Sequence, residues 1–261
     1  MLDVFNFANP QTCNYQEFHG SNVYYDWVKP KGVSMIRFLL IGAGGAGTAG
    51  SSAAGGAGGA SGAVTTWIGP AMFVPDELQI FVAAGTASSG SLVNTTAVNW
   101  QGPTSSTPYS LLLATGNRGG AAPADSPNNY FGASGIFNSV AGQAGAAAGS
   151  SITASTTTFL SGGAGGANII TSAGGNVATK YGYPAVLGGA ATGAVGGDGY
   201  FLTQPLLLNT GGAGGGGNGS GTGGIGGKGA IGCGGGGGGR GTTAGGSGGR
   251  GGDGAVFIWS W

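Results

Sequence analysis

Residues 35–50 read MIRFLLIGAGGAGTAG, and this stretch is compatible with two unrelated folds. The apolar run 35–41 is typical of a buried strand. It breaks into 42–47, which match the G-x-G-x-x-G pattern of dinucleotide-binding domains, but that pattern requires a following helix and an acidic residue about 20 positions later. Further glycines and a β-like ending follow instead, and no Asp or Glu occurs between Gly42 and Asp76. We therefore interpret the stretch as the boundary between a β-strand and a glycine-rich segment.

The composition excludes several classes of protein. Glycine accounts for 65 of the 261 residues, whereas an average protein contains about 7% glycine. Only 6% of the residues are charged and 40% are hydrophobic; disordered chains are more polar and more charged, so we expect a folded protein. The Lys and Arg residues are too scattered to neutralise phosphates, and no apolar run approaches the roughly 20 residues of a membrane span. We expect neither a nucleic-acid partner nor membrane insertion.

Six short segments are typical of β-strands, because they are rich in β-branched, aromatic and aliphatic residues and are bounded by Gly or Pro. They are 22–28, 33–41, 63–68, 77–83, 108–114 and 255–261. No window shows a helical apolar period free of Gly and Pro. The aromatic C-terminal segment is expected to return and pair with the N-terminal strands. The fold predicted from these segments is all-β, a jelly-roll-like β-sandwich with almost no α-helix.

Glycine is concentrated in five runs, at 42–62, 132–149, 162–175, 188–199 and 211–254, and 28 of the 44 residues in the last run are Gly. Ordering a glycine costs about 0.5–1 kcal/mol relative to alanine, so a folded state must use a property that only glycine has. Close approach between backbones is that property. We therefore predict an inserted bundle of polyglycine-II helices, extended helices with three residues per turn that bond to their neighbours.

Collagen and disorder are the two alternatives for the glycine runs. Collagen requires a strict Gly-X-Y period with abundant proline, but no proline follows Pro205 and the run GGGGGG at 234–239 ignores that period. Disorder is opposed by apolar and aromatic connectors at 127–137, 156–160, 180–187 and 200–208, which a flexible linker would not need.

The predicted domain organisation has three parts. Residues 1–21 form an N-terminal docking segment. Residues 22–115 and 255–261 form the β-sandwich frame, which includes the glycine run 42–62. Residues 116–254 form the glycine-rich polyglycine-II insertion.

Few side chains are candidates for chemistry. Cys13 and Cys233 lie too far apart in sequence for a metal or redox motif; free thiols are favoured over a disulfide. His19, the only histidine, is interpreted as a satisfied or exposed residue near a turn. Asp76 and Glu77 are adjacent and would point to opposite sides of a strand. We therefore predict no catalytic residue, no cofactor and no metal, and a protein that is not an enzyme.

Several motifs, taken in order, carry a resemblance to a known family. YYDWVKPKGVSMIRFLLIGAGGAG at 24–47 resembles the opening of glycine-rich domains in bacteriophage tail fibres and related virion proteins. GASGAVTTWI, PDELQIFVAAGT and PYSLLLATGNRGG continue the resemblance, and GGRGGDGAVFIWSW is similar to the closing segment of the family. The resemblance covers about residues 22–261 and implies a β-rich frame with an inserted polyglycine-II bundle. The chain reads as one domain without a recognisable fibre-attachment domain, so its position (tail tip, head fibre or capsid spike) stays open.

The resemblance implies a virion surface protein that is made in the host cytoplasm without a signal peptide and that attaches to a host receptor, either protein or glycan. Exposed aromatic side chains are typical binding anchors. The candidates for receptor contact are Tyr130, Phe131, Tyr181, Tyr183, Tyr200 and Phe201. The alternative for each is packing between the bundle and the sandwich.

A second hypothesis is a purely structural capsid decoration or spike component without receptor binding. The segment LDVFNFAN at 2–9 would then dock on other virion proteins through Val4, Phe5 and Phe7, which are too apolar for a free end. Either hypothesis implies a homo-oligomer, and a homotrimer by analogy to jelly-roll spikes.

Overall fold

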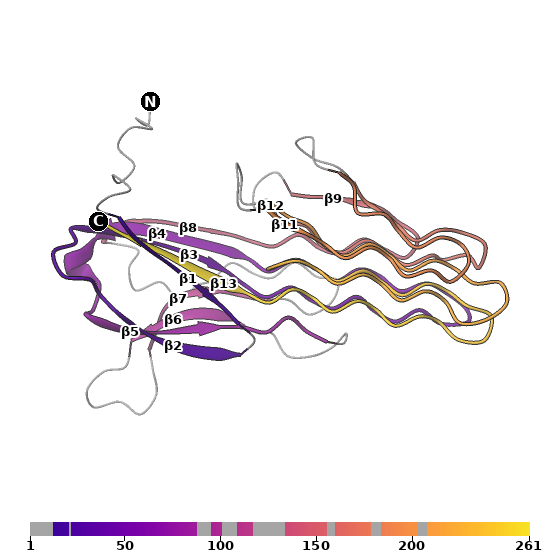
Figure 1. Ribbon diagram of the computed structural model, residues 1–261, viewed down its shortest axis with the longest axis horizontal. Helices are drawn as coiled ribbons and strands as arrows, with labels where there is room; N and C mark the ends of the chain where they lie inside the picture. The colour runs from indigo at the N-terminus through magenta and orange to yellow at the C-terminus, as the bar shows by residue number, and fades with distance from the viewer. Residues whose placement is uncertain are drawn as a thin grey trace.

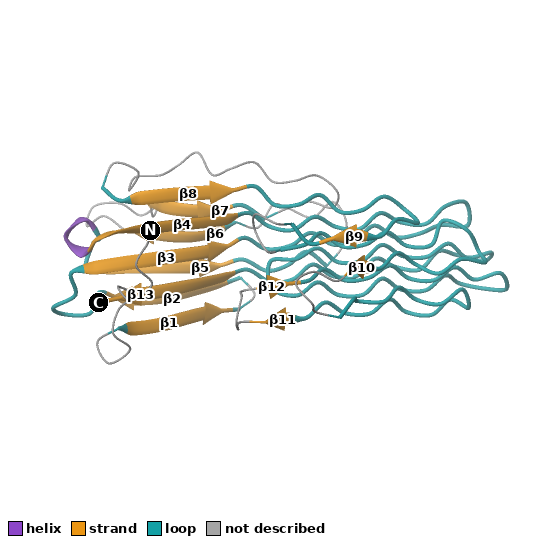
Figure 2. Ribbon diagram, turned by 90° about the horizontal axis from the view of Figure 1, so that it is seen from above, coloured by secondary structure: helices purple, strands orange, loops and turns teal. Residues whose placement is uncertain are grey.

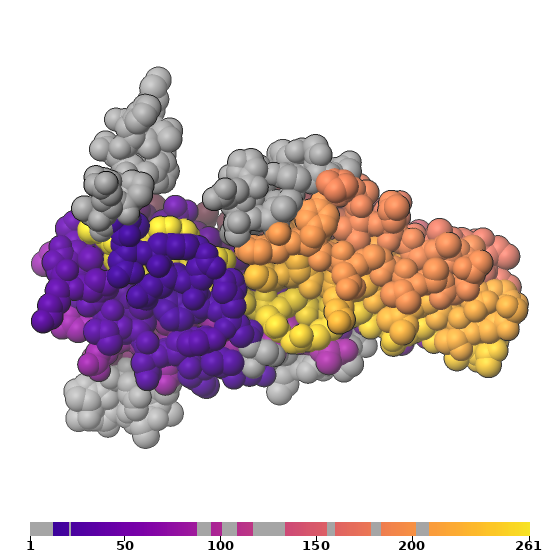
Figure 3. Space-filling view, in the orientation of Figure 1, coloured from indigo at the N-terminus to yellow at the C-terminus, as the bar shows by residue number. Residues whose placement is uncertain are grey.

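The structure is a computed structural model, and it describes residues 13–20, 22–87, 95–100, 109–116, 134–155, 160–178, 184–202 and 208–261. A β-sandwich occupies one end of the molecule, and long glycine-rich segments run side by side away from it (Figure 1). In the space-filling view the two parts form one elongated body (Figure 3).

Five strands form the first sheet, which we name sheet A. Its order is β1 (Asn14–His19), β13 (Ala255–Ser260), β3 (Met35–Ile41), β4 (Val64–Pro70) and β8 (Ile136–Val140). All neighbours are antiparallel. The C-terminal strand therefore lies between two N-terminal strands, as the sequence predicts (Figure 2).

Four strands form the second sheet, sheet B. Its order is β2 (Val23–Val28), β5 (Glu77–Val82), β6 (Thr96–Trp100) and β7 (Tyr109–Ala114), again antiparallel. A single turn of 3-10 helix, η2 (Ala71–Phe73), connects β4 of sheet A to β5 of sheet B. Two short strand pairs lie outside the sandwich: β9 (Ile152–Thr153) with β10 (Val177–Ala178), and β11 (Phe201–Leu202) with β12 (Leu208–Asn209).

The main core lies between the two sheets. Alternate residues of β3, namely Ile36, Phe38 and Leu40, are fully buried and pack with Trp27 and Ile80 of sheet B. Successive side chains of a strand point to opposite faces, so the residues between them lie on the outer face of sheet A. This packing confirms the predicted all-β sandwich with almost no helix, and the structure shows that both of its sheets are antiparallel.

Two strands of sheet A lie outside residues 22–115 and 255–261, which the sequence predicts as the frame. β1 belongs to sheet A although its residues fall in the predicted docking segment 1–21, and β8 belongs to it although its residues fall in the predicted insertion 116–254. β1 reads NYQEFH and is the edge strand of the sheet. Because an edge strand is partly exposed, its sequence is polar and does not show the apolar pattern that predicts a strand. β8 reads IFNSV between glycines, and only its pairing with β4 makes it a strand of this sheet.

The glycine-rich segments are held together by backbone hydrogen bonds with a period of three residues. Every third residue of 235–240 donates its N–H to the same neighbouring segment, over 2.8 to 3.0 Å. The donor and acceptor pairs are Gly235 to Gly45 and Gly238 to Thr48, Gly236 to Gly227 and Gly239 to Gly224, and Gly237 to Ala164 and Arg240 to Ala167. One segment therefore bonds to three others, and the backbone groups are satisfied without side chains.

Glycine is required in these segments because the backbones lie too close for a β-carbon. A β-carbon on Gly236 would overlap the carbonyl oxygen of Ala213, and one on Gly237 would overlap that of Gly56. At position 232 glycine is also required by the backbone conformation, because the φ of +68° lies in the left-handed region that glycine adopts readily. It makes the turn at which the bundle reaches the sandwich, against Ile41 of β3.

We predict that Gly236→Ala lowers the free energy of unfolding by at least about 2 kcal/mol, because the added methyl group must displace a neighbouring backbone. Gly219→Ala is the matched control: no atom lies within 4 Å of the position that its β-carbon would take, and we expect a change within about 0.5 kcal/mol. Urea unfolding measures both. Equal stability of the two variants would contradict close packing at Gly236.

Candidate functional site

The described part of the chain contains no group of three His, Cys, Asp or Glu side chains that could hold a metal ion. Among those same residues, no helix is long and apolar enough to cross a membrane. The candidate site comprises the surface of the bundle and the contacts that hold the bundle in place.

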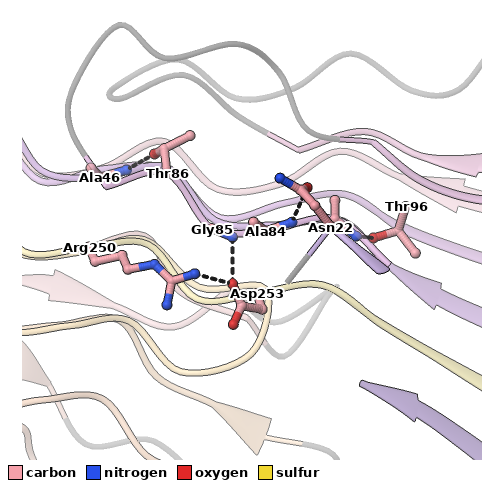
Figure 4. A network of polar contacts seen from close by, with 9 residues as sticks. Asn22, Ala46, Ala84, Gly85, Thr86, Thr96, Arg250 and Asp253 are labelled. Atoms are coloured by element: carbon pink, nitrogen blue, oxygen red, sulfur yellow. Dashed lines mark hydrogen bonds and ion pairs between the residues drawn. The ribbon is translucent and has the colours of Figure 1, made fainter. Parts of the chain in front are cut away.

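A charged pair fixes the junction between bundle and sandwich. Asp253 lies two residues before Ala255, the first residue of β13. Its carboxylate accepts hydrogen bonds from the buried backbone N–H of Gly85 at 2.7 Å and from the Arg250 guanidinium at 2.5 Å (Figure 4). Gly85 follows β5 of sheet B, whereas Asp253 leads into β13 of sheet A. One carboxylate thus ties the ends of both sheets at the point where the glycine segments begin.

Hydroxyl and amide side chains extend this junction. Thr86 Oγ1 accepts a hydrogen bond from the Ala46 N–H at 2.5 Å, and Asn22 Oδ1 accepts one from the Ala84 N–H at 3.0 Å (Figure 4). The first bond holds the extension of β5 against the first glycine segment, and the second holds it against the residue that precedes β2. The bundle consequently leaves the sandwich in a defined direction.

A second core lies at the end of the bundle nearest the sandwich, which we name the root of the bundle. The root covers the outer face of sheet A. Leu39, Ile41 and Phe257 of the sheet pack with Leu160 and Cys233 of the glycine-rich insertion. Both cysteines are free thiols. Complete burial raises the pKa of the Cys233 thiol to about 12, so this side chain is neutral and unreactive at physiological pH.

The far end of the bundle is built from turns between glycine segments, and we name it the distal tip. Its turns comprise residues 51–54, 169–172, 190–194, 218–222 and 241–244, and Figures 1 and 2 show the bundle ending at them, away from the sheets. The turns contact one another: Asn218 bridges both Thr192 and Gly241, and Thr222 bridges Ala244. The Arg240 guanidinium also donates to the carbonyl oxygen of Ser52 at 3.0 Å, so the tip is one connected surface.

The distal tip is rich in hydroxyl groups and nearly uncharged. Exposed hydroxyl residues include Ser51, Ser52, Thr171, Thr192, Ser220, Thr222, Thr242 and Thr243. Ile169 in the tip and Ile225, three residues beyond the turn 218–222, add exposed apolar side chains, with exposed fractions of 58% and 48%. Arg240 is the one charged residue within or beside these turns. Such a surface suits a neutral partner recognised by hydrogen bonds and apolar contact.

Residues 20–260 match the model of a family described as a glycine-rich domain. The chain belongs to this family. No curated protein matches the chain. The predicted glycine-rich domain is thereby confirmed over nearly the whole chain, whereas its link to bacteriophage fibres stays a prediction.

Two of the predicted receptor contacts of this glycine-rich domain can be placed. Tyr200 is half buried against the small cluster that contains Val177 and Val186, and its hydroxyl donates to the carbonyl oxygen of Pro184 at 2.7 Å. Phe201 packs against the root core beside sheet A. Both lie near the sandwich and not at the distal tip, and their contact role stays a prediction.

The other predicted site residues lie outside the described residues. They are Tyr130, Phe131, Tyr181 and Tyr183 among the receptor contacts, and Val4, Phe5 and Phe7 in the docking segment. The sequence interpretation missed the turns of the tip, because it searched for aromatic anchors. The available signal was the pairs and triplets of Ser, Thr and Asn that interrupt the glycine runs, as in GSS at 50–52 and GTT at 241–243.

The glycine-rich domain also brings one titratable cluster together on β1. Glu17 accepts a hydrogen bond from the Tyr15 hydroxyl and contacts the His19 imidazole at 3.0 Å. The bond from Tyr15, followed by the contact with His19, lowers the pKa of the Glu17 carboxyl, whereas burial and the same carboxylate raise that of the Tyr15 hydroxyl. Elsewhere the Lys29 ammonium pairs with Asp76 at 2.7 Å.

The junction generates a first prediction. Asp253→Ala leaves the buried Gly85 N–H without its acceptor, so we expect the free energy of unfolding to fall by about 1–3 kcal/mol. Asp253→Asn keeps an acceptor oxygen and should lose less. Urea unfolding at constant pH measures both, and an alanine variant as stable as the wild type would contradict the role of this carboxylate.

The thiols generate a second prediction. At pH 8 we expect an alkylating reagent to modify only Cys13 in the native protein and both cysteines after unfolding, because Cys233 is buried and its thiol has a pKa of about 12. The folded state favours the neutral thiol, so this protection and its contribution to stability are lost as the pH rises from about 9 toward 12. Mass spectrometry counts the modified thiols, and Cys13→Ser is the control. Rapid native labelling of Cys233 would contradict its burial.

Proposed function

We propose that this protein is a non-enzymatic virion surface protein, a phage fibre or spike, that attaches to a host receptor through its distal tip. The observation that carries the proposal is the separation of the two ends of the molecule. The sandwich lies at one end, and the turns that form the distal tip lie at the other. A long stalk that ends in a connected set of exposed turns suits attachment at a distance.

We infer that the glycine segments are polyglycine-II helices and that they form a rigid stalk. The three-residue period of the hydrogen bonds supports this interpretation, because polyglycine-II has three residues per turn. A helix bonded to several neighbours cannot bend without breaking bonds to all of them. The stalk therefore holds the distal turns in one arrangement, and less conformational entropy is lost when they bind.

The chemistry of the tip indicates the kind of receptor. Hydroxyl side chains donate and accept hydrogen bonds, and the two exposed isoleucines provide apolar contact. With Arg240 as the single charge, the tip offers little long-range attraction to strongly charged surfaces. Neutral glycans and uncharged protein loops fit this surface.

A second candidate function is a structural capsid decoration or spike component without receptor binding. The observation that favours it is an apolar surface at the basal end of the sandwich, where Met72 is 81% exposed and Phe73 is 49% exposed. Exposed apolar side chains of this size commonly mark protein contacts. Attachment of this end to other virion proteins is compatible with either function, and only receptor binding distinguishes them.

Competition for adsorption tests the proposal. The purified chain should block adsorption of the parent virus to host cells, and the double variant Ile169→Ser, Ile225→Ser should block at least about tenfold less well, because it removes two apolar anchors from the tip. Met72→Ser, at the opposite end, is the matched control and should compete like the wild type. Thermal unfolding verifies that all three chains are folded.

The outcomes separate the hypotheses. A tip variant that competes as well as the wild type would contradict contact through the distal turns. In that case Tyr200→Ser and Phe201→Ser, tested in the same assay, decide whether the predicted aromatic contacts act instead. A wild-type chain that binds particles but does not block adsorption would support the structural alternative.

A further inference from the structure

A row of large side chains crosses the outer face of sheet A. The strand registers place five residues side by side, one on each strand: Tyr15, Trp259, Arg37, Ile68 and Ile136. Their sequence neighbours on the central strands, such as Phe38 and Trp67, are buried between the sheets. Since successive side chains alternate, the row points away from sheet B. We name it the outer row.

The outer row is partly ordered by its own contacts. The rings of Tyr15 and Trp259 are stacked, with centroids 5.2 Å apart and an angle of 29° between their planes. The guanidinium carbon of Arg37 lies 5.1 Å from the centroid of the Trp259 ring. Because β13 lies between β1 and β3, Trp259 is flanked by both side chains. The row is therefore preorganised before any partner binds.

Tyr15 and Ile136 at the two ends of the outer row are exposed, and Trp259, Arg37 and Ile68 between them are half-buried. The root of the bundle covers Leu39, Ile41 and Phe257, and Trp259 lies at its border. Beyond that border Ile136 is 75% exposed and Tyr15 is 46% exposed. Figure 3 shows atoms of the C-terminal strand, in yellow, at the surface of the sandwich. Exposed Trp, Tyr and Arg beside aliphatic residues are typical of protein interfaces.

Arg37 carries the one charge within the row, and the Glu17 carboxylate on the same face contacts the Tyr15 hydroxyl and His19. The ion pairs among the described residues are His19 with Glu17, Lys29 with Asp76, and Arg250 with Asp253, and none includes Arg37. Burial lowers the pKa of the Arg37 guanidinium below its ordinary value, because the charge has lost part of its hydration. A partly desolvated cation is stabilised by a carboxylate partner. An acidic surface on a partner would therefore stabilise the positive charge of Arg37.

Such a surface exists on the other side of the sandwich. A hollow of about 320 Å³ opens at β2 and β5 of sheet B, and its lining includes Asp26, Glu77, Val28 and Gln79. Both carboxylates are exposed, and neither belongs to an ion pair among the described residues. Val28 is 64% exposed and adds apolar surface. The hollow therefore offers the negative charge that the outer row lacks and an apolar surface that matches the apolar side chains of the row.

We propose that the outer row of one copy of this chain docks into the acidic hollow of a second copy, with Arg37 facing Asp26 and Glu77. The two surfaces belong to opposite sheets, so each copy can use both at once. A contact of this head-to-tail kind repeats from copy to copy and gives a ring or an open stack, depending on the rotation between neighbouring copies. Contact between two identical outer rows is disfavoured because it would place two Arg37 side chains against each other. This inference does not depend on the proposed receptor.

Charge exchange tests the contact. By analytical ultracentrifugation, we expect the wild-type chain to form an oligomer. Arg37→Glu should weaken association at least about 100-fold, and so should the double variant Asp26→Lys, Glu77→Lys, because each places like charges in contact. The triple variant Arg37→Glu, Asp26→Lys, Glu77→Lys restores opposite charges and should recover the oligomer. Lys228→Glu, an exposed reversal on the bundle, is the matched control and should leave the oligomer intact.

Each outcome decides the proposal. A wild-type chain that stays monomeric at concentrations on the order of 100 µM overturns it. An oligomer that Arg37→Glu disrupts but the Asp26, Glu77 reversal does not would show that the row meets another surface, and this also overturns the proposed pairing. Failure of the triple variant to reassemble, with unchanged thermal unfolding, has the same meaning. Should a reversal unfold the chain, Arg37→Gln and Asp26→Asn with Glu77→Gln provide milder tests with the same expected direction.

Discussion

The structure depends on hydrogen bonds between backbones that lie too close together for a β-carbon. Where Gly234 to Gly239 run through the bundle, each residue bonds to a neighbouring segment, and most substitutions there would place a methyl group on a carbonyl oxygen. Glycine is the most costly residue to order, so this arrangement is stable only when many segments bond at once. The bundle is therefore cooperative: no single glycine segment has hydrogen-bond partners without the others.

This constraint explains why the bundle and the sandwich have different structural roles. A bundle with few side chains cannot make a large apolar core of its own, and the two sheets provide that core together with a template for the first and last glycine segments. The Asp253 carboxylate and the root core around Cys233 connect the two parts. Side chains that could recognise a partner remain where the close packing ends, at the turns of the distal tip and on the uncovered part of sheet A.

The sequence predicted the structure best where a residue pattern is compatible with only one type of secondary structure. The strands β2, β3, β4, β5, β7 and β13 were predictable because apolar, β-branched runs between Gly and Pro have few alternatives. β1 and β8 were not assigned to the frame, since a polar edge strand and a short strand among glycines are defined by their partners. Likewise Tyr200 is predicted as an exposed anchor from its aromatic ring, but only the position of Val177, Val186 and Pro184 shows what that ring contacts.

The sequence by itself determined the composition-driven features: an all-β frame, a glycine-rich insertion that a dinucleotide site cannot explain, and few charges. The tertiary structure alone decided which residues meet. Tyr15, Arg37, Ile136 and Trp259 are distant in sequence and form one row only through the order of the strands. The turns of the tip gather for a similar reason, because the lengths of the hydrogen-bonded segments set where each turn ends. Local sequence specifies the conformation of a segment, whereas strand order and backbone register specify its neighbours.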